Sequence, residues 1–389
     1  MGPLKNRLMV VSDIHFLARE LYAESPLFLR ALQASDGKVT HLSDQLMEAL
    51  VKEVRTVSPD ALIVTGDLSL NGEKQSHTAV AGYLARIRDA GTPVYVIPGN
   101  HDILSTSARR FIGENVQSAE NLSPEGFRVC YQRFLGACTG PGFSYVVPLA
   151  GNIWVVMLDT CVYRDGGRIH AEFTPAHERW LLHVLSQAKQ AGIQVITASH
   201  HALIPHTRFA QENFAIRGRE RMLTLLAEND VRLHLSGHLH AQHISREKGV
   251  TDAATTGFCI TPHGYALVSW MHDGTMRYEM NRIRDAYLPE KVQRYSRDWF
   301  LQVNESRNYQ ALAGLPLSEV QKRDMAAFSA RFSLAFFTGA YHTQDRSWEK
   351  EDAYALWKAH PAGIFGAYFS CVTEETHGEN MHATVLSKA

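Results

Sequence analysis

Six short apolar runs in this sequence each end in residues that can bind a metal ion. Asp, Asn and His are costly to bury without partners, so this placement, repeated six times, needs a common cause. Only nitrogen and oxygen ligands are involved. We interpret the pattern as one polynuclear metal site at one edge of a sheet. The runs are VVSDIH (Asp13, His15), IVTGD (Asp67), VIPGNHD (Asn100, His101, Asp102), VVMLDT (Asp159), ITASHH (His200, His201) and HLSGHLH (His238, His240).

Short β-branched stretches alternate with amphipathic helical patterns over most of the chain, which predicts a layered α/β fold with a largely parallel sheet. In such folds ligands bind beyond the carboxyl ends of the strands, and the polar residues above fall there. We expect strands at 8–11, 61–65, 93–97, 153–158, 193–198 and 231–235, and helices at 44–57, 76–91 and 174–192.

Two segments depart from this alternation. Residues 16–43 separate the first motif from its helix by more than a usual loop, so they are a candidate cap over the site. From about residue 288, three helical patterns with aromatic apolar faces follow one another. The sequence therefore predicts a main domain at 1–287 and a small α-helical domain at 288–389.

The composition of the chain limits which partners the protein is expected to bind and in which cellular compartment it is expected to lie. The formal net charge is −1, with 39 basic and 40 acidic residues, which argues against binding long nucleic acid. The 5 cysteines are odd in number and form no CxxC pair, which favours reduced thiols and a cytoplasmic protein. No apolar segment approaches the length of a membrane span, so we expect no membrane partner. The sequence leaves a homo-oligomer open.

The motifs Asp-x-His, Gly-Asp, Gly-Asn-His, a later His and Gly-His-x-His occur here in that order. Together they resemble the calcineurin-like metallophosphoesterase superfamily over roughly residues 8–285. The resemblance implies an αββα-type sandwich with 1–287 as its catalytic domain. It also implies two metal ions that share one carboxylate, and this ligand chemistry suits first-row ions such as Mn, Fe or Zn. By resemblance, one ion takes Asp13, His15, Asp67 and His240, and the other takes Asp67, Asn100, His200 and His238.

The resemblance also implies a mechanism. Water activated as hydroxide by the two ions attacks phosphorus in line, and His101 assists the leaving-group oxygen as proton donor or electrostatic stabiliser. Asn100, a neutral ligand, leaves room for a phosphate. His200 matches the family ligand better than His201, which then faces substrate or packs structurally. Asp102 orients His101 or fixes its loop.

Comparison of the short motifs with those of different metallophosphoesterases indicates the class of substrate. Protein Ser/Thr phosphatases carry Gly-Asp-x-Val-Asp-Arg-Gly where this chain has GDLSLNGEK. GDLSLNGE, PGNHD and SHH instead look like bacterial cyclic nucleotide and glycerophosphodiester phosphodiesterases. We therefore expect a phosphodiesterase acting on a small diester. The alternatives are a phosphomonoesterase and a nuclease that acts on short nucleotides. A non-catalytic metal-binding scaffold has less support, because every expected ligand and His101 are present.

Other polar residues are assigned structural roles. Asp159 matches no family ligand, and His77 is expected to support or cap rather than to bind a metal ion. For His263 and Tyr265, a structural role and a place at the rim of the site are both open. Interdomain or surface contacts are expected for Tyr341, His342 and Asp345.

Overall fold

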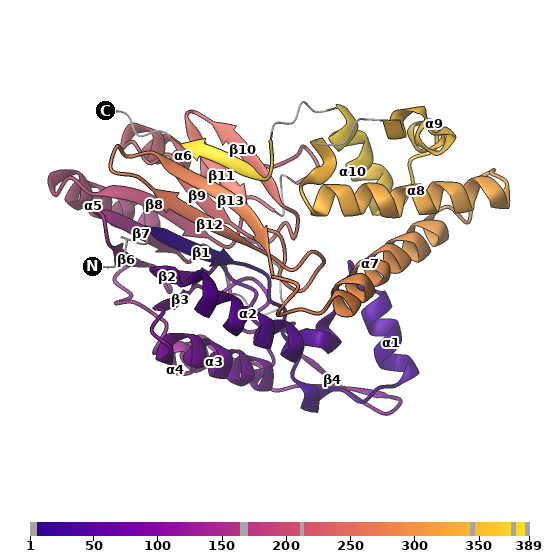
Figure 1. Ribbon diagram of the computed structural model, residues 1–389, viewed down its shortest axis with the longest axis horizontal. Coiled ribbons are helices and arrows are strands. Elements are labelled where there is room, and N and C mark those ends of the chain that lie inside the picture. The colour runs from indigo at the N-terminus through magenta and orange to yellow at the C-terminus, as the bar shows by residue number, and fades with distance from the viewer. Residues whose placement is uncertain (1–5, 164–169, 211–213, 343–346, 375–378, 386–389) are drawn as a thin grey trace.

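Two six-stranded mixed sheets pack face to face at the centre of the molecule in this computed structural model (Figure 1). The predicted fold class is confirmed, and each of the six expected strands is present. Each sheet has a run of parallel strands, at one end of the first sheet and in the middle of the second, and the remaining strands pair antiparallel. The structure describes residues 6–163, 170–210, 214–342, 347–374 and 379–385, so Asp345 lies outside the described residues.

The first sheet has the strand order β14-β13-β12-β1-β2-β3. Its three parallel strands, β1, β2 and β3, place their carboxyl ends at one edge, where the first three motifs follow. The strands are β1 Arg7–Val11, β2 Ala61–Val64, β3 Val94–Val96, β12 Gly264–Trp270, β13 Met276–Arg282 and β14 His382–Val385.

The second sheet has the order β10-β11-β9-β8-β7-β6. Strands β7, β8, β9 and β11 are parallel, so the two His motifs after β8 and β9 also share one edge. The strands are β6 Tyr145–Leu149, β7 Ile153–Leu158, β8 Gln194–Ser199, β9 Leu233–Ser236, β10 His243–Glu247 and β11 Val250–Ala254.

Alternating side chains divide the core into layers. In β1, Leu8 and Val10 enter the cluster between the sheets, whereas Met9 and Val11 face the helices outside. This follows from the two-residue period of a strand, and burying each such side chain is worth about 1.5–3 kcal/mol. The helices α2 (Ser43–Val57), α3 (Lys74–Asp89) and α4 (Pro124–Tyr131) cover the first sheet. The second sheet is covered by α5 (Pro175–Gln190) and α6 (Arg219–Glu228).

The segment 16–43 folds as a compact excursion beside the first sheet. It contains η1 (Arg19–Leu21), α1 (Pro26–Gln33) and η2 (Thr40–Leu42). Ala23 N donates to Phe111 O at 2.8 Å, which ties the excursion to the hairpin of β4 (Arg109–Ile112) and β5 (Asn115–Ser118).

The last four α-helices of the described chain lie on the right-hand side of Figure 1, and all but the first of them form a separate aromatic core. They are α7 (Glu290–Ala311), α8 (Glu319–Phe337), α9 (Asp352–Ala359) and α10 (Gly363–Glu374). Two features differ from the prediction. The helix α10 was not expected, and the described tail does not stay helical, because β14 returns to pair antiparallel with β13. No helix in the described ranges is long and apolar enough to cross a membrane.

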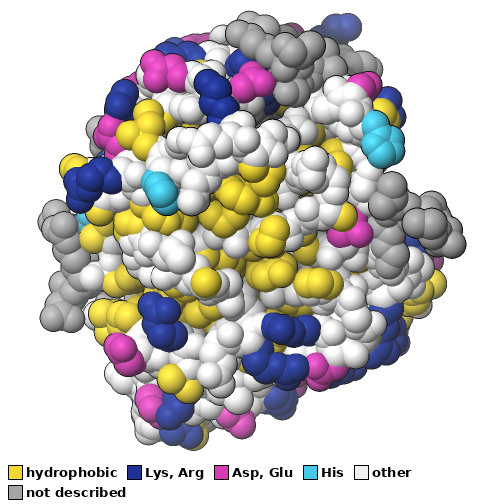
Figure 2. Space-filling view, turned by 90° about the vertical axis from the view of Figure 1, so that its left-hand side faces the viewer, with side chains coloured by type: hydrophobic (Ala, Val, Ile, Leu, Met, Phe, Trp, Pro, Cys, Tyr) yellow, Lys and Arg dark blue, Asp and Glu magenta, His cyan; other side chains and the backbone are white. Residues whose placement is uncertain are grey.

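Figure 2 shows one face of the molecule, turned by 90° from the view of Figure 1. Hydrophobic side chains lie across its middle, and Lys and Arg are scattered among acidic and neutral side chains. Among the described residues of this face, no continuous basic stripe is visible.

Candidate metal centre

Five loops from the two sheets converge at the carboxyl ends of β1, β2, β3, β8 and β9. Backbone hydrogen bonds hold the loops in register: Asp13 N donates to Gly66 O at 3.1 Å, and His15 N donates to Asp67 O at 2.9 Å. At the edge of the second sheet, Gly237 N donates to His200 O at 2.9 Å. Backbone hydrogen bonds thus connect the loops that carry the candidate ligands.

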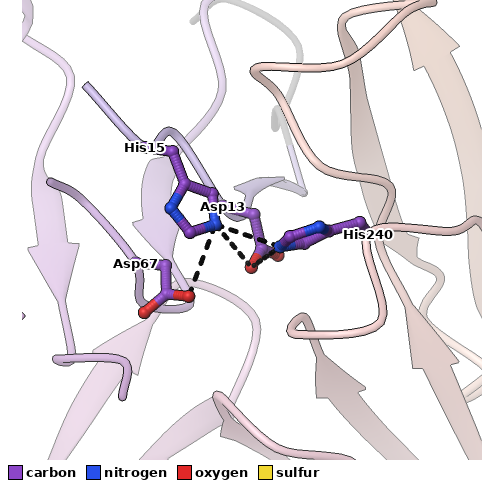
Figure 3. A group of neighbouring side chains, drawn as sticks. All are labelled: Asp13, His15, Asp67 and His240. Carbon is purple, nitrogen blue, oxygen red and sulfur yellow. Dashed lines mark hydrogen bonds and ion pairs between the residues drawn. The ribbon is translucent and has the colours of Figure 1, made fainter. Parts of the chain in front are cut away.

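The first group consists of Asp13, His15, Asp67 and His240, whose candidate ligand atoms all lie within 4.8 Å of one another. Figure 3 shows the four side chains pointing toward a common centre. Nε2 of His15 lies 3.5 Å from Asp67 Oδ2 and 3.0 Å from His240 Nε2. Asp13 Oδ1 lies 3.3 Å from His240 Nε2.

The second group consists of Asp67, His200 and His238, and it shares Asp67 with the first. Asp67 Oδ2 lies 3.4 Å from His200 Nε2, and Asn100 Oδ1 lies 3.0 Å from the same nitrogen. The His200 and His238 rings are 5.0 Å apart between centroids. All seven residues predicted as ligands are therefore brought together, in the two sets expected.

The chemistry of these atoms fits metal cations. Asp13 Oδ1 and Asp67 Oδ2 are buried, accept no hydrogen bond and face imidazole nitrogens. Burial opposes ionisation of Asp67, but His200 and His101 outweigh it and hold the pKa of this carboxyl well below its usual range. Burial also lowers the pKa of His238 to about 3, so this ring is neutral at physiological pH. Burial also lowers the pKa of His200 and His240, but neighbouring carboxylates outweigh it and raise both to about 9, so a metal ion would have to displace their protons. Deprotonated carboxylates and neutral imidazoles are the forms that bind metal ions.

The backbone at the candidate ligands is unusual. Five of the seven adopt positive φ values in the left-handed region, which non-glycine residues seldom occupy: Asp13 (53°), His15 (43°), Asp67 (51°), His238 (62°) and His240 (57°). Each such residue costs about 1–3 kcal/mol, and such strain concentrates at functional sites. This clustering supports a functional role for the five residues.

The glycines of the motifs permit the close approach of the loops. A Cβ on Gly66 would lie 2.6 Å from His200 Nδ1, and one on Gly99 would lie 2.2 Å from Asp67 Oδ1. Gly66 also has φ of 98°. A side chain at either position would displace a candidate ligand, which explains why Gly precedes both Asp67 and Asn100.

His101 lies on the open side of the centre and is held from two directions. Its side chain is 29% exposed, and its Nε2 lies 4.0 Å from Asp67 Oδ2. Its backbone N donates to Asp67 Oδ1 at 2.9 Å. Its Nδ1 lies 2.9 Å from Asn71 Oδ1, so a proton on Nδ1 would be donated to Asn71. Sequence analysis missed Asn71, although it follows Asp67 by four residues in the same loop.

Asn71→Ala should lower kcat by about fivefold to tenfold while the metal content stays unchanged. The variant loses one hydrogen bond, worth about 1 kcal/mol, that orients His101. Asn71→Asp should restore most of kcat because Asp can also accept the bond. Steady-state kinetics with metal analysis measures both effects. Asn121→Ala, which removes a donor to Ser105 O in a neighbouring exposed segment, is the matched control and should leave kcat unchanged.

Asp102 fixes the loops instead of contacting His101 through its side chain. Its carboxylate accepts hydrogen bonds from the backbone N of Leu68, Ser69 and Gly99 at 2.8–3.1 Å. His77 Nε2 lies 2.9 Å from Asp102 O and 3.0 Å from Ser69 Oγ, consistent with the expected supporting role. The two residues join the loops that carry Asp67 and Asn100.

The remaining strand-end residues lie outside both groups. His201 is buried, stacks against His238 at 4.2 Å and contacts Cys161, which favours the packing alternative over substrate contact. Asp159 accepts bonds from Phe143 N and Tyr163 Oη, and burial raises its pKa to about 6.

Two residues farther along the chain also have structural partners. His263 Nδ1 lies 2.9 Å from Phe258 O, and Tyr265 Oη donates to Glu53. Tyr341 packs against Phe332 and Trp348 among the C-terminal helices. Neither His263 nor Tyr265 belongs to the two metal groups.

The segment 16–43 supplies two charged residues that sequence analysis did not single out. Asp36 Oδ2 accepts a hydrogen bond from His240 Nδ1 at 2.6 Å. Lys38 Nζ donates to Asp36 Oδ1 at 2.7 Å. The segment 16–43 therefore contacts a candidate ligand directly.

Comparison with known families agrees with this geometry. The model of the calcineurin-like phosphoesterases matches residues 6–242, and that of the C-terminal domain of cyclic nucleotide phosphodiesterase matches residues 290–379. The chain belongs to the calcineurin-like phosphoesterase family and is a hydrolytic phosphoesterase. Members of this family use divalent metal ions, and the clustered ligands described above are compatible with that use.

Individual relatives are distant. A cAMP/cGMP dual specificity phosphodiesterase of Mycobacterium tuberculosis is 25% identical over 257 residues, which cover 65% of this chain and 68% of the relative. A probable cyclic nucleotide phosphodiesterase of Rhodococcus erythropolis is 26% identical over 259 residues, covering 66% and 72%. The crystal structure of a dimetal phosphatase from Danio rerio superposes with a TM-score of 0.54 at 15% identity, covering 72% and 96%, and this similarity concerns the fold.

Proposed function

We propose that this protein is a dinuclear metal-dependent phosphodiesterase that hydrolyses a small diester, either a cyclic nucleotide or a glycerophosphodiester. The observation that carries the proposal is the position of Asp67 Oδ2, which belongs to both ligand groups. A carboxylate between two such groups is the arrangement that two-metal hydrolases require. When bound, two first-row ions, Mn, Fe or Zn, would supply Lewis acidity and an activated water.

The residues of the chain would bind the two ions and position the substrate. Asp13, His15 and His240 would hold one ion, and Asn100, His200 and His238 the other, with Asp67 between them. Asn100 is neutral, which limits the negative charge that an incoming phosphate meets. His101 would place Nε2 beside the leaving-group oxygen, with Asn71 holding Nδ1. In this role His101 donates a proton to that oxygen or stabilises its developing charge.

Three observations support a diester. The relatives above are named for cyclic nucleotides, and the C-terminal helices match the domain of such enzymes. Lys38, the cation beside the first group in the described part of the chain, is already paired with Asp36. A singly charged diester needs fewer cations than a dianionic monoester, so this charge balance suits it. We place the reaction in the cytoplasm on the cysteine pattern.

The test is hydrolysis of bis-p-nitrophenyl phosphate by metal-free protein before and after reconstitution with Mn²⁺. We expect turnover only with the metal, and with it faster cleavage of 3′,5′-cyclic nucleotides or glycerophosphodiesters than of p-nitrophenyl phosphate. A preference for the monoester would contradict the diester assignment. Protein that holds two ions and hydrolyses none of these substrates would contradict the enzymatic proposal itself. Hydrolysis of a dinucleotide, measured in the same panel, tests the alternative that the protein is a nuclease acting on short nucleotides.

A further inference from the structure

The contact between Asp36 and His240 sets the orientation of the imidazole. An ionised carboxylate can only accept hydrogen bonds, so His240 Nδ1 carries the proton in this 2.6 Å contact. Nε2 is then the nitrogen that faces the first metal group, where it lies 3.3 Å from Asp13 Oδ1. Without Asp36, the ring could adopt the other tautomer or rotate away from the group.

Lys38 holds the other oxygen of the same carboxylate. Its Nζ lies 2.7 Å from Asp36 Oδ1, and the Lys38 and Asp36 side chains are 14% and 22% exposed. Charge-assisted bonds of this length are stronger than neutral ones. The two oxygens of Asp36 are thus divided between a cation and a candidate ligand, which fixes the carboxylate plane.

The C-terminal helices hold the segment that carries Asp36 and Lys38. Gly37, between them, has φ of 100°, and a Cβ there would lie 2.5 Å from Cδ2 of Phe300 in α7. The ring of Phe300 is fully buried against Cys259 and Ile260. Val39 N donates to Cys259 O at 3.0 Å, so the same core holds the segment from its far end.

The same helices hold the loop that carries His240. Both neighbours of His240, Leu239 and Ala241, pack in the aromatic core of the C-terminal helices. Gln242 N donates to Phe337 O at the end of α8, at 2.9 Å. Both partners of the Asp36–His240 hydrogen bond are therefore anchored to the helical part of the chain.

We propose that Asp36 is a positioning residue for His240 as a ligand of the first metal group, and that the C-terminal helices hold the two in register. The inference rests on the two-metal site proposed above. Carboxylates that orient a metal-binding His change metal affinity by about 10–100-fold. The helical part of the chain would then stabilise one of the two ions, in addition to any contact with substrate.

The test is a calorimetric titration of metal-free, full-length protein with Mn²⁺, accompanied by metal analysis. We expect two ions in the unmodified protein. In Asp36→Ala, one ion should bind about 10–100-fold more weakly while the other keeps its affinity. Asp36→Asn should show a smaller loss, because its amide oxygen can still accept from His240 Nδ1. A general structural defect would not produce this selective loss and partial rescue.

Asp230→Ala is the matched control. Asp230 also pairs with a basic side chain, Arg232, at 2.6 Å, but it precedes β9 at the end away from the candidate ligands. This variant should bind both ions as the unmodified protein does. Equal affinities in Asp36→Ala and the unmodified protein would overturn the inference. Fewer than two ions in the unmodified protein would instead contradict the proposed two-metal site.

The contribution of α7 is tested with Phe300→Leu, which keeps an apolar side chain in the buried position but loses the ring against Gly37. Circular dichroism establishes that the variant is folded. We expect weaker binding of the ion that Asp36→Ala affects, with the other unchanged. Unchanged affinity for both ions in the folded variant would overturn the part assigned to α7.

Discussion

Asp67→Asn is expected to abolish turnover and to remove at least one metal ion per chain. Asp67 Oδ2 lies 3.5 Å from His15 Nε2 and 3.4 Å from His200 Nε2, so it is the atom common to both groups. Asn keeps an oxygen that can accept from His101 N but removes the negative charge between the two ions. We expect affinity for at least one ion to fall more than about 100-fold, beyond the range for residues that only orient ligands.

Asp159→Asn is the matched control for this experiment. Asp159 is also a buried carboxylate at the end of a strand, but its partners are Phe143 N, Tyr163 Oη and Cys161 N. The single amide oxygen of Asn can still accept from Tyr163 Oη and Cys161 N, and only the bond from Phe143 N is lost, so we expect a folded protein that binds both ions and hydrolyses substrate. Metal analysis and calorimetry on both variants show whether the loss of metal binding is specific to Asp67→Asn. An Asp67→Asn protein that is fully loaded and active would contradict the bridging role.

The candidate ligands could be found from the sequence because each one follows a buried strand directly. Strand ends at one edge of parallel sheets converge, so Asp13, Asp67 and His200 had to lie near one another once the strands were recognised. The resemblance to the family motifs then separated the five motifs from the sixth, because Asp159 matches no family ligand. Asp159 also ends a strand, yet the structure gives it backbone and Tyr partners outside both metal groups.

The supporting residues could not be found in this way. Asp36 lies in an irregular segment 204 residues from His240, and its place is set by the packing of α7 against Gly37. Asn71 is close in sequence to Asp67, but nothing in its type separates it from an ordinary turn residue. Only the folded geometry shows that its Oδ1 faces His101 Nδ1.

Two elements of the C-terminal region were missed for related reasons. The buried side chains of Gly363–Glu374 lie on one face of α10, but Ile364 and Ala367 on its exposed face are also apolar, so the segment lacks the polar stripe by which a helix is recognised. The strand β14 has only four residues, and it forms because the edge of β13 is available for pairing. Elements that depend on a distant partner carry little local signal.

His101→Ala is expected to lower kcat by about 10²–10⁴-fold while both metal ions remain bound, the range for loss of a general acid. His101 belongs to neither of the two ligand groups, so its side chain is not needed to assemble them. Metal analysis, thermal unfolding and steady-state kinetics would be measured on the same preparation. Loss of a metal ion in this variant would show that His101 is a ligand and would contradict its assigned role.

Two substrates with different leaving groups can distinguish the two roles that remain open for His101. p-Nitrophenolate departs without a proton, whereas the sugar oxygen released from a cyclic nucleotide needs one. If His101 donates a proton, His101→Ala should slow cyclic nucleotide hydrolysis far more than bis-p-nitrophenyl phosphate hydrolysis. Equal losses on both substrates would assign His101 to electrostatic stabilisation of the phosphate instead. Asn71→Ala should show the same dependence on the substrate with a smaller loss of rate, because Asn71 acts on the reaction only through His101.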